Sequence, residues 1–183
     1  MSTAIATPSS VELQSTESHL LYTAACSVKA LLRTSDATTG LLTSNLHSNF
    51  AHLAPARPSL PSIETFVCSV ATTLSATPVV VVTSLIYVER LSARLPQSAR
   101  GKADTPYRIF LAALLLADKY WSDQAVKVKM LVAATGGLFR HREILAMERA
   151  LLRILRFDLF VSADQIRDFA SKLGIDINAT TSL

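Results

Sequence analysis

Apolar residues are most continuous between Pro106 and Trp121, where the chain reads PYRIFLAALLLADKYW. No polar side chain interrupts the run from Ile109 to Ala117, so at helical pitch the segment is apolar on every side. A helix of this kind has to be surrounded by other elements. The run is far too short to cross a bilayer, which needs about 20 apolar residues. The pattern therefore predicts a central core helix over Pro106–Trp121.

Elsewhere apolar positions recur three and four residues apart, which is typical of amphipathic helices. We expect six further helices, over Glu17–Arg33, Ser62–Leu74, Thr77 to Leu91 or Leu95, Gln124–Ala134, Arg140–Leu155 and Ser162–Gly174. The run Val79–Val82 would also suit a buried strand, but the Thr-Pro start and the helical neighbours favour a helix. Gly136 and Gly137 form a helix stop. The predicted fold class is all-α.

The composition divides the chain into three parts. Residues 1–57 are rich in Ser, Thr and Ala and are predicted to be a low-complexity leader with one possible amphipathic helix. Residues 58–161 hold the regular helical pattern, and residues 162–183 hold a C-terminal helix and tail. The apolar stripe of the leader helix favours packing on the domain over binding a partner.

Charge and cysteine content change this picture only a little. The chain has 183 residues and a net charge of +4, and all of the excess lies after residue 57. This excess helps approach to an acidic partner but is weak support for nucleic-acid binding. Cys26 and Cys68 have no metal-ligand spacing, and the N-terminus shows no signal-peptide pattern. We therefore expect an intracellular protein, in the nucleus, the cytoplasm or both.

Two charged residues stand in apolar surroundings on different predicted helices. Lys119 follows Leu116 by three positions at the end of the central helix, and Glu148 precedes Leu152 by four. Each charge is costly to bury alone, so we expect the two to form an ion pair. The pair can be purely structural. It can also keep spare hydrogen-bonding capacity for a partner's backbone, since a lysine has three donors and a carboxylate about four acceptor sites.

The sequence offers no candidate catalytic site. The four histidines are scattered and form no triad or metal-ligand spacing, and no Gly-rich phosphate loop is present. Asp118 lies beside Lys119, but adjacent helical residues point about 100° apart and do not share a site. We expect neither an enzyme nor a bound metal or cofactor.

Several short motifs, taken together and in order, resemble the cyclin box. They are YVERL at Tyr87–Leu91, RIF at Arg108–Phe110, Ala112–Lys119, Asp123, Met147–Glu148 and LRFDL at Leu155–Leu159. The Arg-x-Phe before the central helix and the Lys-x-x-x-Asp after it are most similar to the fungal PCL-type cyclins. Residues 58–161 would then be one cyclin box.

The resemblance implies a five-helix bundle around a buried central helix, with additional N-terminal and C-terminal helices. It implies that Lys119 and Glu148 pair with each other and bond the backbone near the αC helix of a kinase. It also implies that a pocket for an apolar side chain of that helix is formed by Leu116, Tyr120, Leu152, Phe157 and Leu159.

The implied function is that of a regulatory subunit. Binding would select the inward position of αC in a cyclin-dependent Ser/Thr protein kinase, and so activate it in cell-cycle or nutrient-signalling control. The implied partners are a kinase of the PCL-cyclin type and the protein substrates of the complex, with no nucleic acid and no membrane. The Met-Arg-x-x-Leu patch that some cyclins use to dock substrates is absent, because Ser62–Val67 reads SIETFV.

The rival hypothesis is a cyclin-like helical module that binds nucleic acid or serves as a transcription-related scaffold. Arg149, Arg153 and Arg156 are spaced to share one side of a helix, and they could form a basic stripe with the residues at 140–142. Acidic residues at 143, 148 and 158 interrupt that charge. A solvated helix face is therefore the better interpretation.

Overall fold

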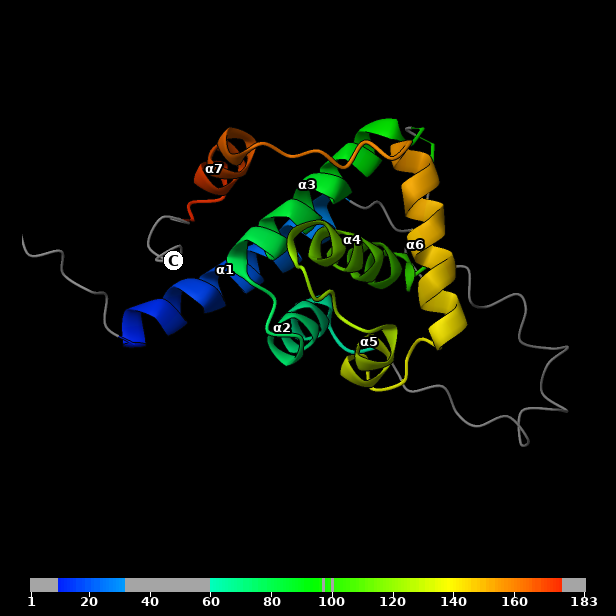
Figure 1. The fold of residues 1–183 in the computed structure, drawn as a ribbon, viewed down its shortest axis with the longest axis horizontal. Helices are drawn as coiled ribbons and strands as arrows, with labels where there is room; N and C mark the ends of the chain where they lie inside the picture. Colours follow the sequence, from blue (N-terminus) through cyan, green and yellow to red (C-terminus); the bar gives the residue numbers. More distant parts are fainter. Residues whose placement is uncertain (1–9, 32–59, 97, 100, 176–183) are drawn as a thin grey trace, which may run out of the picture.

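The computed structural model describes residues 10–31, 60–96, 98–99 and 101–175. The seven elements in these residues are all α-helices (Figure 1). Their bounds are α1 (Ser10–Leu31), α2 (Ile63–Thr73), α3 (Pro78–Arg94), α4 (Thr105–Trp121), α5 (Val128–Ala134), α6 (His141–Leu155) and α7 (Ala163–Lys172). The predicted all-α fold is confirmed. Among the described helices, none combines the length and the apolarity that a membrane crossing requires.

Helix α4 lies at the centre of the bundle, as its sequence predicted. It packs against α1, α2, α3 and α6 (Figure 1). Every side chain from Phe110 to Ala117 is buried. These residues can be buried on all sides of the helix because none of them carries a polar group that would need a partner.

Helix α3 is buried to the same degree, which the sequence did not predict. It packs against α1, α4, α6 and α7, and every residue from Val80 to Val88 is buried. Thr77 caps its first turn, and Pro78 occupies a position where a missing N–H costs nothing. The preference for a helix over a strand at the four valines is confirmed.

Helix α1 docks on the bundle through small and branched apolar side chains. Leu20, Ala24, Ala25 and Val28 are buried where α1 packs against α2 and α3. The helix begins earlier than predicted, at Ser10. The leader helix therefore packs on the domain, the alternative that its apolar stripe favoured.

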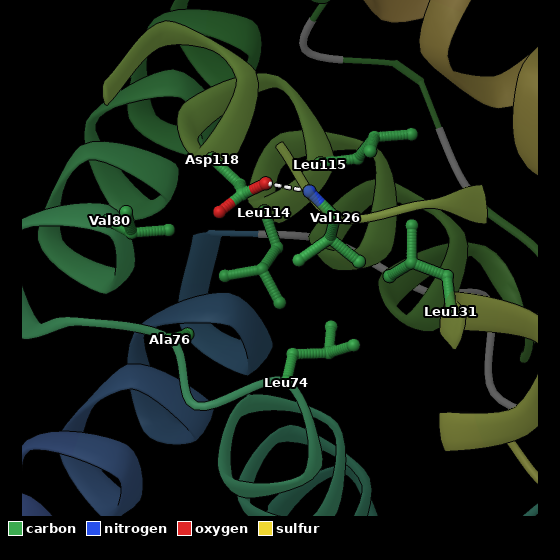
Figure 2. Close-up of a pocket in the computed structure, with 8 residues that line it drawn as sticks. All are labelled: Leu74, Ala76, Val80, Leu114, Leu115, Asp118, Val126 and Leu131. Atoms are coloured by element: carbon green, nitrogen blue, oxygen red, sulfur yellow. Dashed lines mark hydrogen bonds between the residues drawn. The ribbon is translucent and has the colours of Figure 1, made fainter. Parts of the chain in front are cut away.

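The carboxylate of Asp118 holds the connection between α4 and α5. Its Oδ2 accepts a hydrogen bond from the Val126 N–H at 2.6 Å (Figure 2), and its Oδ1 accepts one from the Ser122 hydroxyl at 2.9 Å. The bond from the Val126 N–H to Asp118 holds the backbone at Val126 outside a helix. The prediction of a helix from Gln124 is corrected, since α5 begins at Val128.

A small apolar gap lies beside this connection. It has a volume of about 10 Å³ and is lined by Leu74, Ala76, Val80, Leu114, Leu115, Asp118, Val126 and Leu131 (Figure 2). A space of this size holds at most one water molecule. It is a gap in the packing and not a ligand site.

The predicted helix ends agree with the local backbone. Gly136 and Gly137 both have positive φ, and the Gly137 N–H bonds the Val132 carbonyl at 3.1 Å, so the glycines stop α5. Ser162 and Gln165 form the predicted capping box of α7, with bonds of 3.2 and 3.0 Å. The domain boundaries after residues 57 and 161 stay predictions.

Candidate functional site

Lys119 and Glu148 meet at the edge of the bundle. Lys119 stands in the last turn of α4 and Glu148 in the middle of α6, and these two helices pack together. The lysine Nζ donates a hydrogen bond to Glu148 Oε1 at 2.5 Å. The position of Lys119 is favourable because the C-terminal end of a helix attracts a cation.

The two members of this pair differ in their access to water. The Lys119 side chain is 40% exposed and the Glu148 side chain is 10% exposed. Within the described residues, Glu148 is the one hydrogen-bond partner of the Lys119 ammonium. A lysine has three N–H donors, so donors remain for an incoming carbonyl oxygen.

Of the five apolar residues that the resemblance implies, the structure exposes some and buries others. Leu116 is 3% exposed and belongs to the core beneath Lys119, whereas Leu152 is half-buried on α6. Tyr120 is 40% exposed and packs edge-to-face on Trp121 with ring centroids 5.3 Å apart. Aromatic surface of this kind is enriched in protein interfaces.

Phe157 is the most exposed of these residues, at 69%. It follows α6 in a left-handed turn, because Arg156 has φ of 54° and Phe157 has φ of 60°. Such angles are uncommon for residues with a side chain and cost of order 1 kcal/mol or more each. The turn places the Phe157 ring in solvent, and Leu159, two residues on, is half-buried.

Residues of α3 hold the segment that carries Phe157 and Leu159. The Tyr87 hydroxyl donates to the Leu159 carbonyl at 2.8 Å. Arg90 donates to the carbonyls of Asp158 and Phe160 at 2.9 and 2.8 Å. Burial raises the pKa of the Tyr87 phenol well above its usual value, so the hydroxyl is a donor at physiological pH.

Sequence reasoning did not assign these positioning roles. Tyr87 and Arg90 stand three residues apart and therefore share one side of α3, which was the available signal. Trp121 was also missed. Its indole N–H donates to the Thr83 hydroxyl at 2.9 Å and so attaches the end of α4 to α3.

Comparison with known protein families identifies the family of this chain. The family described as the cyclin N-terminal domain matches residues 52–160, which is more than half of the chain. The chain belongs to the cyclin family. The resemblance inferred from the motifs is therefore confirmed, and α2 to α6 of this cyclin are the helices of its box.

Three curated relatives come from Saccharomyces cerevisiae (strain ATCC 204508 / S288c). PHO85 cyclin-1 is 35% identical over 107 residues, which cover 58% of this chain and 38% of the relative. PHO85 cyclin-9 is 35% identical over 95 residues, covering 52% and 31% respectively. PHO85 cyclin-2 is 34% identical over 90 residues, covering 49% and 29%. The chain thus aligns with less than two fifths of each relative's length.

Proposed function

We propose that this cyclin is the regulatory subunit of a cyclin-dependent Ser/Thr protein kinase of the kind that partners PHO85 cyclins, and that it activates the kinase. The Lys119–Glu148 pair carries the proposal, because an ion pair with spare donors stands beside the exposed Tyr120 and the half-buried Leu152. Polar groups in apolar surroundings are typical of the residues that dominate binding energy. The role is regulatory and not catalytic.

In this proposal the Lys119–Glu148 pair forms hydrogen bonds with the backbone of the kinase's αC helix. The exposed side of Lys119 donates to a carbonyl oxygen, and Glu148 keeps the ammonium in place. Tyr120, Leu152 and Phe157 contact an apolar side chain of that helix, with Leu159 at the rim and buried Leu116 as the floor. These positions of Lys119, Glu148 and their neighbours support the proposal.

Activation follows from differential binding to two positions of αC. A kinase fluctuates between an inward αC, whose Glu meets the β3 Lys, and an outward one. A subunit that binds the inward position more tightly shifts the population toward it. We further propose that the complex acts on protein substrates in the nucleus or cytoplasm, in cell-cycle or nutrient-signalling control.

The test uses the full chain and the purified cyclin-dependent kinase Pho85 of S. cerevisiae as the probe. Binding is measured by calorimetry, and activation by phosphate transfer to a protein substrate. The double variant Lys119→Met/Glu148→Leu is compared with the control Lys29→Met/Glu64→Gln. The control removes a Lys–Glu pair between α1 and α2, whose Nζ–Oε1 distance is 3.6 Å.

We expect the wild-type chain to bind and activate the kinase, and the control to behave like wild type. The Lys119/Glu148 double variant is expected to lose at least tenfold in affinity, since each 1.4 kcal/mol of lost binding energy is a factor of ten. Circular dichroism verifies that each variant is folded. Full activation by a folded Lys119/Glu148 double variant would refute the assigned roles, and a wild-type chain that leaves the kinase inactive would refute activation.

A further inference from the structure

Leucine and arginine alternate along one outward side of α6. The positions are Arg142, Leu145, Arg149, Leu152 and Arg156, separated by steps of three, four, three and four residues. We call this set the leucine–arginine seam. The three arginines are exposed and the two leucines are half-buried. Steps of three and four residues keep Arg142, Leu145, Arg149 and Leu152 on one side of the helix, as in surfaces that pack against another helix. Arg156 is the C-cap that follows the last residue of α6.

The core-facing side of α6 is separate from the seam. It consists of the residues of this helix that are buried in the bundle: Ile144, Glu148, Leu151 and Leu155. Helix α6 lies at the edge of the bundle, with α4 on its inner side (Figure 1).

The acidic residues near the seam do not neutralise it. Glu143 accepts a bond from the Arg140 backbone N–H at 2.9 Å and pairs with Arg108 at 3.5 Å. Glu148 is bonded to Lys119, and the Asp158 carboxylate is bonded to Arg94 at 2.8 Å. The sequence places these acids among the arginines, but their contacts here are with groups other than the seam arginines.

The seam arginines are free within the part of the chain that the structure describes. The guanidinium groups of Arg142, Arg149 and Arg156 form no hydrogen bond or ion pair with a described residue, and the same holds for neighbouring Arg153. Among the described residues no carboxylate pairs with these arginines, so this side of α6 presents unpaired positive charge.

The seam continues the proposed kinase-binding surface. Leu152 belongs to that surface. Arg149, three residues before it, is its neighbour on the helix, and Arg156 follows at the C-terminal end of α6. A partner that covers Leu152 and the C-terminal end of α6 must pass over both arginines. Removing their water without supplying an anion would be unfavourable, because an unpaired guanidinium is costly to bury.

We infer that the leucine–arginine seam selects an acidic helical surface on the partner kinase, in which carboxylates alternate with apolar side chains. This inference rests on the proposed function and adds the chemistry that distinguishes a matching kinase from others. A carboxylate can accept two parallel bonds from one guanidinium, so each seam arginine specifies a position as well as a charge. From Arg142 to Leu152 the seam extends about 15 Å along α6 at 1.5 Å per residue, enough for about three turns of a facing helix.

A nucleic acid is the less favoured occupant. A phosphate backbone would use the arginines but would leave Leu145 and Leu152 without apolar contact. A helix with alternating acidic and apolar residues uses both residue types, so the alternation favours protein.

The experiment measures association and dissociation rates with purified Pho85 kinase at low and high salt. The seam variant is Arg149→Glu/Arg156→Glu. The matched control is Lys129→Glu/Lys172→Glu, which makes the same change of charge at two exposed lysines on α5 and α7. A third variant, Arg149→Lys/Arg156→Lys, keeps the charge but removes the planar group that binds a carboxylate through two bonds. Duplex DNA is titrated in parallel.

For the seam variant we expect the association rate to fall roughly tenfold or more at low salt and its salt dependence to become weaker, because opposite charges steer association. Dissociation should also become faster, and the lysine variant should recover association but not slow dissociation. The matched control should stay within about twofold of wild type.

Three results would overturn the inference while leaving the proposed function in place. They are wild-type rates for the seam variant, an equal loss in the matched control, or a loss of DNA binding with kinase rates unchanged. The last of these would assign the seam to nucleic acid. If the wild-type chain binds no kinase at all, the proposed function and this inference both fail.

Discussion

Removing the Lys119 ammonium should lower the free energy of unfolding more than removing the Glu148 charge. Lys119→Met leaves a carboxylate that is only 10% exposed without its ammonium. Breaking a fully buried pair costs about 3–5 kcal/mol, and breaking an exposed pair costs about 0–1 kcal/mol. Because Lys119 is 40% exposed, water can reach the remaining carboxylate. We therefore expect a loss of about 2–3 kcal/mol for Lys119→Met.

Substitution of Glu148 leaves the Lys119 ammonium, which water can hydrate. In Glu148→Gln the amide oxygen still accepts a bond from Lys119, and the ammonium is exposed enough to be hydrated. The expected loss is about 1 kcal/mol or less. The two variants should thus differ by at least about 1 kcal/mol, although both should weaken kinase binding.

Urea denaturation followed by circular dichroism measures the difference. Equal slopes with shifted midpoints indicate a change in stability alone. Lys29→Met is the control, because its side chain is 72% exposed and the loss should be below about 1 kcal/mol. A larger loss for Glu148→Gln than for Lys119→Met would refute the asymmetry derived from burial.

Three further variants test the positions of the surrounding residues. Tyr87→Phe leaves the Leu159 carbonyl without its donor and should cost about 1–2 kcal/mol by urea denaturation. Because the folded pKa of this phenol is raised, its contribution is full below about pH 10 and is lost at higher pH, so the gap to wild type should narrow there. Asp118→Ala should release the Val126 amide, which hydrogen exchange would detect as faster exchange at that site; unchanged protection would contradict the role of Asp118. Phe157→Gly should stay within about 1 kcal/mol of wild-type stability, because it relieves a positive φ, and yet bind kinase at least tenfold more weakly; unchanged affinity would remove Phe157 from the surface.

Much of the fold could be predicted because its signals are local. The apolar run of α4, the two glycines after α5 and the Ser162–Gln165 capping box each depend on residues close in sequence. The start of α5 could not be predicted in the same way. It depends on a bond between Asp118 and Val126, in which a carboxylate on one helix fixes the backbone of the following loop.

The charged pair of the candidate site could be predicted from the sequence, but the hydrogen bonds that hold the surrounding residues in place could not. A lysine and a glutamate in apolar surroundings indicate a pair, because a buried charge needs a partner. The bonds from Tyr87 and Arg90 to residues about 70 positions later carry no local signal. The partners of the acidic residues on and after α6 could not be predicted either, because residues close to the arginines in sequence bond other groups in space.

Helix α3 connects the two halves of the proposed surface. Near its middle, Thr83 accepts the Trp121 N–H and so fixes the end of α4, beside Lys119. One turn later, Tyr87 holds the segment that presents Phe157. Because every residue of α3 from Val80 to Val88 is buried, these two attachments belong to one rigid element. A partner helix therefore meets a surface whose polar and aromatic parts are already fixed relative to each other, which lowers the entropy lost on binding.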